Sequence, residues 1–338
     1  MFFFSGIGYS QILGCTDPLS KNYNPLATKN DGSCKYANAK VGFSKSFELN
    51  EMIKETSGLL AYDGYLWTHN DDKDVNLYGF SIDSILSFKK SKINFSKKIP
   101  LVKTKDWEAI AQDSLYFYVG DFGNNYRGNR QDLTVYKIQK DSLQNIKTLN
   151  FSYENQRDFT PKKTNKTDFD CEAMISLGDY LYLFTKEWTS KKTTVYKVLK
   201  SGENQVAQKV SEFNVEGLIT DATYLADKNL LVLLGYSDKI KPFVYLFYDF
   251  KKDAFFSGNK RKIILKANFY QTEGIATTDG LTYFVSNEKL RALNGIIDVK
   301  PQIHVLNLSA FLTNYISKFA EVINLGEEYL PVEIEIEE

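Results

Sequence analysis

A short phrase recurs five times along the chain. Each copy has an acidic or hydroxyl residue followed by Gly or Ala, at the start of a strand-like run. The copies are Ser57-Gly58-Leu59, Glu108-Ala109-Ile110, Glu172-Ala173-Met174, Asp221-Ala222-Thr223 and Glu273-Gly274-Ile275. They return about every fifty residues, a period typical of β-propeller blades. The sequence therefore predicts an all-β fold, a five-bladed β-propeller, with six blades as the alternative.

Each of the first four repeats divides into four short strands. In the first repeat these are Gly58–Tyr62, Tyr65–Thr68, Leu77–Ile82 and Ile93–Leu101. The fifth repeat lacks its own fourth strand. We expect the segment Lys40–Leu49 to supply it and so to close the ring, which removes exposed sheet edges. The segment Phe319–Leu325 is the rival for that place, and a short helix is expected at Phe311–Ser317.

Composition excludes several classes of function. The 338 residues carry 42 Lys+Arg and 42 Asp+Glu, so the chain has no excess of positive charge that would favour nucleic-acid binding. The longest aliphatic run, Leu230 to Leu234, is too short to span a bilayer. The sequence shows no Ser-His-Asp order, phosphate-binding loop, zinc motif or dinucleotide fingerprint. We expect a monomer that binds no nucleic acid and has no membrane span.

The chain begins with residues 1–11, which are apolar and then small. They resemble the end of a secretory signal peptide, although the basic start is missing; the alternative is a disordered apolar terminus. The predicted domains are this remnant (1–11), a Cys-bracketed module (12–37), the propeller (38–326) and an acidic tail (327–338).

Two cysteines bracket a polar stretch near the N-terminus. The residues between Cys15 and Cys34 are rich in Asp, Asn, Pro and Gly, so burial cannot hold the loop together. A Cys15–Cys34 disulfide is expected, worth roughly 3 kcal/mol for a loop of about 20 residues. Five side chains offer either a calcium site or Asx turns, and both alternatives stay open. They are Asp17, Asn22, Asn24, Asn30 and Asp31. The remaining Cys171 is expected to be a buried free thiol.

The wording GCTDP…NYNP…NDGSC of this module resembles a small module of secreted and surface proteins of Bacteroidetes-type bacteria. The resemblance covers about residues 14–36. It implies a protein exported by a Gram-negative bacterium, either secreted or held at the cell surface.

Equivalent residues of propeller blades meet at one axis. The predicted axial set is Ser57, Glu108, Glu172, Asp221 and Glu273. Converging carboxylates repel one another and need a cation, and oxygen ligands select Ca²⁺. The ion has a functional role, or it only neutralises and fixes the blades. A third alternative is that the carboxylates accept backbone N–H bonds without any metal.

The axial order Ser, Glu, Glu, a polar residue and Glu resembles the calcium-activated nucleotidases (apyrases), which are five-bladed propellers with an axial Ca²⁺. Asp221 departs from that pattern, because it stands where the family has a hydroxyl residue. The phrases Glu55-Thr56-Ser57-Gly58-Leu59 and Asp106-Trp107-Glu108-Ala109-Ile110-Ala111 also resemble SdiA-regulated and esterase-like phytase propellers. That second resemblance spans about residues 50–310 and implies the fold more than an activity.

The loops after each second strand are polar and are expected to line a funnel above the ion. The predicted funnel residues are His69, Asn70, Asp71, Asp121, Asn124, Asn125, Lys186, Glu187, Asn287 and Glu288. The candidates for catalysis are His69, Asp121, Arg127 and Lys186, and for the Arg and the Lys an ordinary solvated loop charge is the favoured alternative. We expect a calcium-binding propeller that holds a small molecule, glycan or peptide in the funnel. A calcium-dependent phosphoester or phosphoanhydride hydrolase is the alternative.

Overall fold

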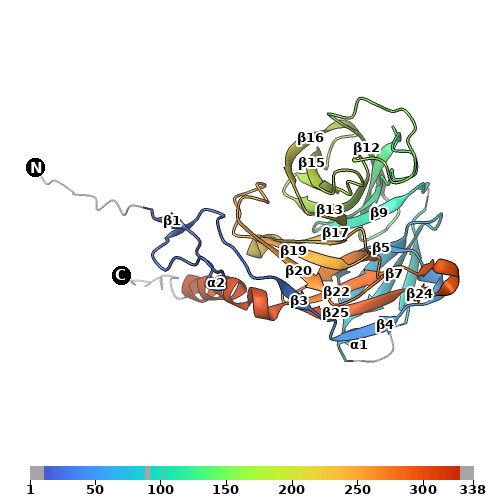
Figure 1. The fold of residues 1–338 in the computed structure, drawn as a ribbon. Coiled ribbons are helices and arrows are strands. Elements are labelled where there is room, and N and C mark those ends of the chain that lie inside the picture. The colour runs from blue at the N-terminus through green and yellow to red at the C-terminus, as the bar shows by residue number, and fades with distance from the viewer. Residues whose placement is uncertain (1–10, 88–91, 101, 328–338) are drawn as a thin grey trace, which may run out of the picture.

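The computed structural model describes residues 11–87, 92–100 and 102–327. The predicted signal remnant and acidic tail lie outside the described residues, apart from Gln11 and Glu327. Within the described part of the chain the fold is all-β, with helices confined to connections and to the C-terminal end (Figure 1).

The strands of the described part of the chain include five antiparallel units of four. The second and third units are joined into one eight-stranded sheet, because their outer strands pair in parallel. The first unit is β5 (Thr56–Tyr62), β6 (Tyr65–Asn70), β7 (Asn76–Ser81) and β8 (Phe95–Lys98). The second is β9 (Trp107–Gln112), β10 (Tyr116–Asp121), β11 (Leu133–Gln139) and β12 (Ile146–Tyr153). The third is β13 (Cys171–Leu177), β14 (Tyr180–Thr185), β15 (Thr193–Leu199) and β16 (Asn204–Phe213). The fourth is β17 (Leu218–Leu225), β18 (Leu230–Tyr236), β19 (Pro242–Tyr248) and β20 (Asn259–Leu265). The fifth is β21 (Thr272–Thr277), β22 (Thr282–Asn287), β25 (Gln302–Asn307) and β4 (Lys45–Glu48).

The fifth unit takes its outer strand from the N-terminal part of the chain, as the sequence predicts. β4 pairs antiparallel with β25, with Phe47 opposite Ile303. The expected single strand Lys40–Leu49 is instead two strands, because β3 (Ala39–Val41) pairs in parallel with β20 of the fourth unit. The rival segment Phe319–Leu325 is helical and belongs to α2 (Ser309–Glu327), which is longer than the helix expected at Phe311–Ser317.

The units lie side by side in chain order, and the fifth returns to the first. Each first strand neighbours the first strand of the next unit, and β21 neighbours β5. Apolar side chains of consecutive units pack together in five clusters, so each sheet is covered on both faces. Each cluster draws members from two consecutive units, for example Leu60 and Ile110, Tyr118 and Met174, Phe184 and Phe247, Val244 and Ile275, and Phe284 and Leu59.

Tight turns join the first two strands of a unit where the sequence predicts them. Asp63 and Gly64 both have positive φ, 50° and 75°, as a two-residue hairpin with right-handed twist requires. The other connections carry short elements that the sequence did not indicate. These are β23 (Leu290–Ala292), β24 (Ile297–Val299), α1 (Ile82–Leu86), and the 3-10 helices η1 (Glu51–Ile53), η2 (Ala226–Lys228) and η3 (Leu293–Gly295).

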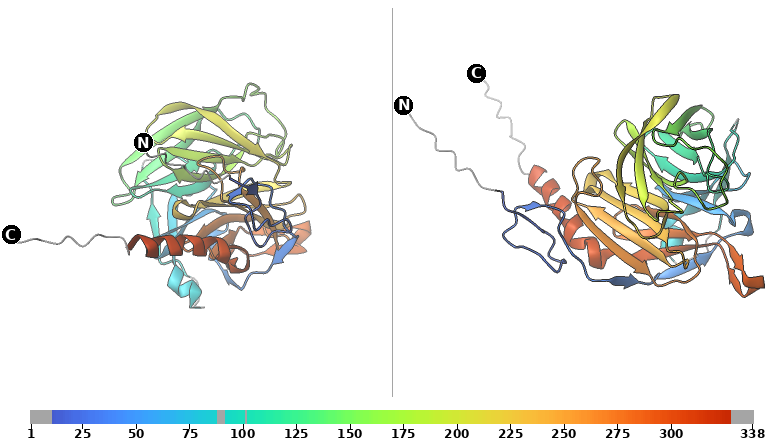
Figure 2. Two further views of the ribbon diagram at one scale, coloured as in Figure 1. Left: turned by 90° about the vertical axis from the view of Figure 1, so that its left-hand side faces the viewer. Right: turned by 45° about the horizontal axis from the view of Figure 1, so that its top comes forward.

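The N-terminal module docks against the outer edge of the fourth unit. It contains a two-residue parallel pair, β1 (Leu13–Gly14) with β2 (Lys29–Asn30), and the predicted Cys15–Cys34 disulfide is present. Asp17 accepts hydrogen bonds from the hydroxyls of Tyr36 and Tyr248, at 2.8 and 2.5 Å. Figures 1 and 2 show this module on the side of the molecule where α2 lies, whereas the β23–β24 hairpin projects on the opposite side.

The Asx-turn alternative is the one the structure displays in this module. The side chains of Asp17, Asn24, Asn30 and Asp31 each accept a hydrogen bond from a backbone N–H two residues later. Asn22 bonds the backbone of Ser33 and Lys35. The free Cys171 is buried, as expected.

Candidate axial site

The five first strands each carry a β-bulge close to the recurring phrase. A bulge inserts one unpaired residue and re-aims its side chain. The unpaired residue is Glu108, Glu172 or Glu273 in three of these strands. In β5 it is Gly58, beside Ser57. The sheet register therefore places the glutamates of three repeats at equivalent positions.

In the fourth unit this register moves the equivalent position from Asp221 to Thr220. Ile219 pairs with Gly235 and Asp221 with Leu234, so Thr220 is the unpaired residue. Its Oγ1 donates to the carbonyl of Thr272 at 2.6 Å, and Ser57 Oγ donates likewise to the carbonyl of Glu108 at 3.0 Å. The axial set is thus Glu108, Glu172, Thr220 and Glu273 at equivalent register positions, with Ser57 next to the bulged Gly58 in the first unit.

Asp221 has a different role from the one the sequence predicts. Its Oδ2 accepts backbone N–H bonds from Ile275 and Leu59, at 2.7 and 3.2 Å. The carboxylate therefore ties three first strands together. Burial raises the pKa of Asp221 well above its usual range, and these N–H bonds only partly offset that effect.

The three axial glutamates converge and are buried, with 2–6% of each residue exposed. The ammonium of Lys186 ion-pairs with Glu172 and lies 3.9 Å from Glu273 Oε1. Burial, and after it the charge of Glu172, raises the pKa of Glu108 well above its usual value. Burial likewise raises the pKa of Glu172 and Glu273, although Lys186 opposes the effect on both.

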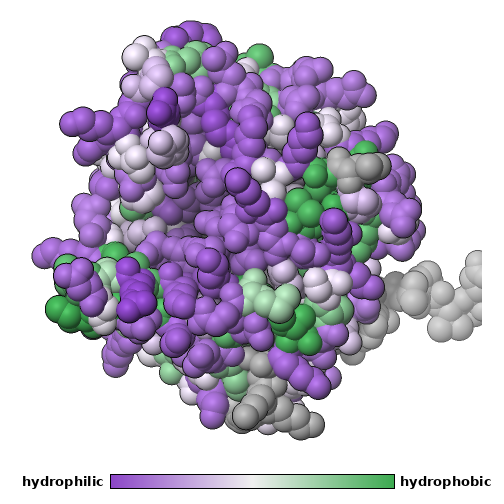
Figure 3. Space-filling model, turned by 90° about the vertical axis from the view of Figure 1, so that its right-hand side faces the viewer, coloured by the Kyte–Doolittle hydropathy of each residue, from purple (hydrophilic) through white to green (hydrophobic). Residues whose placement is uncertain are grey.

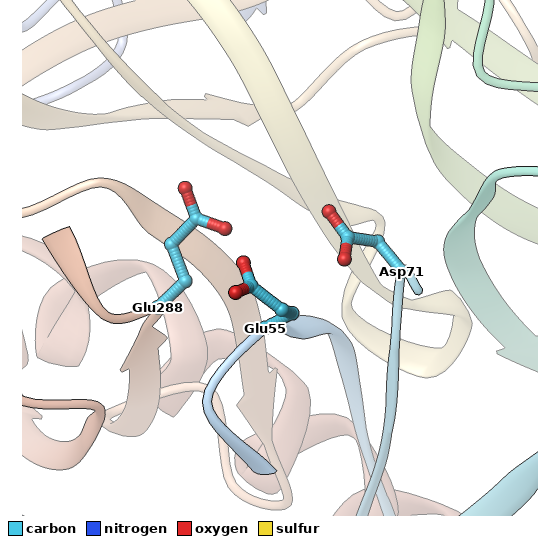
Figure 4. Close-up of side chains that lie close together, drawn as sticks. All are labelled: Glu55, Asp71 and Glu288. Atoms are coloured by element: carbon cyan, nitrogen blue, oxygen red, sulfur yellow. The ribbon is translucent and has the colours of Figure 1, made fainter. Parts of the chain in front are cut away.

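A second acidic group stands at the same end of the axis. The carboxylates of Glu55, Asp71 and Glu288 point toward one another (Figure 4), with ligand atoms all within 4.8 Å of each other. Burial, followed by the charge of Glu55, raises the pKa of Asp71 to about 7. Glu288 also has a pKa raised by burial and then by Glu273. Three half-buried carboxylates so close together could supply ligands to a hard cation.

Asp106 and Asp170 complete what we call the acidic mouth, together with the axial glutamates and the Glu55–Asp71–Glu288 group. Burial, followed by the charge of Asp170, raises the pKa of Asp106 to about 6. A Cβ on Gly123 would lie 2.4 Å from Asp106 Oδ2 and 2.5 Å from Glu108 Oε1. The loop after β10 therefore rests directly on two of these carboxylates.

Figure 3 views the side of the molecule that carries the β23–β24 hairpin and shows a hollow within a largely hydrophilic face. At the other end of the axis the later residues of all five first strands line a cavity of about 350 Å³. Leu60, Ala111, Ile175, Thr223 and Thr277 are among its lining residues. Because all five strands line one cavity, they surround one axis.

Several predicted funnel residues are occupied elsewhere. His69 is fully buried, and burial lowers its pKa to about 4. Asn70 donates to the carbonyl of Met52 and to Asp74. Asn287 bonds the His304 ring and two backbone carbonyls. Each of these side chains makes a hydrogen bond within the protein, as His69 Nδ1 does with the carbonyl of Asn70.

The predicted residues in and beside the loops after β10 and β14 are also hydrogen-bonded within the protein. Asp121 accepts from Arg130 at 2.9 Å and from the backbone N–H groups of Lys105 and Asp106. Glu187 accepts from the hydroxyls of Thr185, Thr194 and Ser190. The Asn124 side chain bonds the backbone of Phe169 and Arg130 and so holds its own loop. The carbonyl of Asn125 accepts from Asn165, and Arg127 is exposed over the Tyr126 ring.

Of the predicted residues, Glu108, Glu172, Glu273, Asp71, Glu288 and Lys186 come together at the mouth. Sequence reasoning missed Glu55, Asp106, Asp170 and Thr220. Three of these acids stand two residues before the first residue of a recurring phrase. Alternate residues of a strand share a face. The repeated acid two positions before the phrase could therefore have predicted that these three carboxylates lie beside the axial glutamates.

No protein-family model matches the sequence, and no curated protein matches it. Among solved structures, the PQQ-bound aldose sugar dehydrogenase of Streptomyces coelicolor is 10% identical, with a TM-score of 0.45 over 78% of this chain and 97% of that one. A glucose dehydrogenase structure from Thermus thermophilus is 8% identical, with a TM-score of 0.41 over 78% of this chain and 99% of that one. Such distant likenesses say nothing of the chemistry of this chain. In the described residues no helix has the length and apolarity to cross a membrane.

Proposed function

We propose that this protein is a five-bladed β-propeller that binds Ca²⁺ at its acidic mouth and holds a ligand above the ion. One observation carries the proposal: the carboxyl groups at the mouth far outnumber the cations beside them. Burial and mutual repulsion raise the pKa of Glu108, Glu172, Glu273 and Asp71. Such a cluster ionises fully only when positive charge enters it.

The donor set fits calcium. Carboxylate oxygens from Glu108, Glu172 and Glu273 supply hard ligands, and Ca²⁺ accepts 6–8 oxygens in flexible geometry. The hydroxyls of Ser57 and Thr220 stand at the remaining positions of the ring, each now bonded to a neighbouring carbonyl. Export from the cell, which the Cys15–Cys34 disulfide favours, would place the protein where calcium is plentiful.

Isothermal titration calorimetry with Ca²⁺ tests this proposal. We expect saturable binding to the wild type and a loss of at least tenfold in affinity for Glu108→Gln, which removes one ligand charge. Glu203→Gln, which changes an exposed acid elsewhere, is the matched control and should bind normally. Equal affinities for all three proteins, or no binding by the wild type, would rule out the axial site.

A calcium-dependent hydrolase of phosphoesters or phosphoanhydrides is the second candidate, favoured by one further observation. Asp71 and Asp106 have pKa values of about 7 and about 6, which suits proton transfer near neutral pH. A bound Ca²⁺ would polarise a phosphoryl oxygen. Turnover of nucleotides or sugar phosphates that a chelator and Glu108→Gln both abolish would favour this candidate. Retained glycan or peptide binding without turnover would favour the binding protein.

A further inference from the structure

Lys186 is a buried lysine at the centre of the acidic mouth. It follows β14 directly, and only 4% of the residue is exposed. Its ammonium ion-pairs with Glu172, lies 3.9 Å from Glu273 Oε1, and sits 5.0 and 5.2 Å from the ring centres of Trp188 and Tyr236. The ammonium therefore stands among the carboxylates that would bind a metal.

A divalent ion and this ammonium compete for the same oxygens. Like charges a few ångströms apart repel strongly in a buried site, where solvent screens them little. Glu172 cannot give its full charge to a metal while it is paired with Lys186. A metal therefore binds at the axis only at the expense of the Lys186 ion pairs.

A displaced Lys186 ammonium would still have attractive partners. Its four-carbon stem is flexible, and the two aromatic rings beside it attract a cation wherever it moves along them. The half-buried carboxyl of Asp106 already feels the charge of Lys186, which lowers the pKa of that group against the dominant effect of burial. An ammonium displaced toward Asp106 would therefore stay near negative charge.

We propose that Lys186 is a built-in counter-ion that competes with the metal for the axial carboxylates and so sets the cation affinity of the mouth. This inference rests on the proposed calcium site. It makes Lys186 a specificity-determining residue: a monovalent ion only replaces the charge that the ammonium withdraws, whereas a divalent ion adds one more, which favours divalent over monovalent ions.

Two measurements test the inference on the full chain. First, Ca²⁺ titration calorimetry compares the wild type with Lys186→Met. We expect the variant to bind at least tenfold more tightly, because no internal cation has to leave. Lys192→Met is the matched control: this lysine pairs with Glu212 at 3.0 Å in the same loop region and should leave the affinity unchanged.

Second, acylation of lysines in the wild type, followed by mass spectrometry, reports the position of Lys186 without any substitution. We expect Ca²⁺ to raise the acylation rate of Lys186 severalfold and to leave that of Lys192 unchanged. This readout also decides the matter if Lys186→Met fails to fold.

The outcomes separate this inference from the proposed function. Tighter binding by Lys186→Met, including binding by the variant alone, supports the inference. Equal or weaker binding by the variant, or no change in Lys186 acylation with Ca²⁺ bound, overturns the inference and leaves the calcium site intact. Absence of Ca²⁺ binding by both proteins overturns both.

Discussion

At the scale of single residues, Gly123 shows how closely the loop after β10 fits the acidic mouth. An added Cβ would stand 2.4 Å from Asp106 Oδ2 and 2.5 Å from Glu108 Oε1. We expect Gly123→Ala to lower the free energy of unfolding by about 1–3 kcal/mol and to weaken Ca²⁺ binding, because both carboxylates have to move. Gly42→Ala, where nothing lies within 4 Å, is the control. Urea unfolding and calorimetry measure the two effects, and identical behaviour of the two variants would contradict this account of the loop.

The pKa of Asp71 gives a second prediction at this scale. Its pKa in the folded protein is about 7, against about 4 in an unfolded chain. The folded state therefore binds a proton that the unfolded state does not, and without metal the free energy of unfolding rises as the pH falls from 8 to 6.5. From about pH 7 downward the trend is opposed by His69 and His304, because burial lowers their pKa values to about 4 and about 3, below the value of about 6.5 in an unfolded chain.

Urea unfolding in a chelator at pH 8 and pH 6.5 measures this slope. We expect Asp71→Asn to reduce it, whereas Asp63→Asn, in an exposed turn, leaves it unchanged. An Asp71→Asn variant with the same slope as the wild type would contradict the assignment.

At the scale of elements, the strand that closes the ring depends on one aromatic anchor. Phe47 of β4 is 8% exposed and packs in the cluster that joins the fifth unit to the first. We expect Phe47→Ala to cost about 3–5 kcal/mol in unfolding free energy and to speed hydrogen exchange along β25, which loses its partner strand. Leu26→Ala, at a 70% exposed position of the module, serves as the control. Unchanged exchange in β25 would mean that β4 does not hold the ring closed.

The N-terminal module is an element whose loss should spare the mouth. Its disulfide closes a polar loop, while Asp17 and Asn30 bond Tyr248, Asp249 and Asn259 of the fourth unit. We expect Cys15→Ser with Cys34→Ser to lose roughly 3 kcal/mol of module stability, seen as faster proteolysis between residues 15 and 34. Ca²⁺ affinity should stay within twofold of the wild type. A large loss of affinity would show that the module supports the mouth.

At the scale of the whole molecule, a cation at the axis would link the first strands of all five units. A ligand at one hundred times its dissociation constant stabilises the folded state by about 2.7 kcal/mol. We therefore expect Ca²⁺ to raise the unfolding temperature saturably and a chelator to reverse the rise. Mg²⁺ should act more weakly, because it demands tighter octahedral geometry. Equal and small effects of both ions, as from screening alone, would argue against a specific site.

The recurring phrase was enough to predict the all-β class, the four-stranded units, the outer strand from residues near 45 and the convergence of Glu108, Glu172 and Glu273. These features follow from local patterns: alternation along strands, tight turns such as Asp63-Gly64, and a fixed period. The Cys15–Cys34 disulfide could also be predicted, because a polar loop between two cysteines has too few apolar residues to be stabilised by burial.

Other features were decided only by the tertiary structure. Asp221-Ala222 has the same wording as the other phrases, yet the pairing of β17 with β18 makes Thr220 the bulged residue. Residues 39–48 divide between two sheets because both outer edges lie within reach of the incoming chain. Lys186 reaches the axis, whereas its neighbour Glu187 turns to the hydroxyls of Thr185 and Thr194. The strand register, the sheet edge with which a strand pairs, and the direction of a side chain all depend on contacts between distant segments. Such contacts produce no repeating pattern in a single sequence, so they could not be predicted from it.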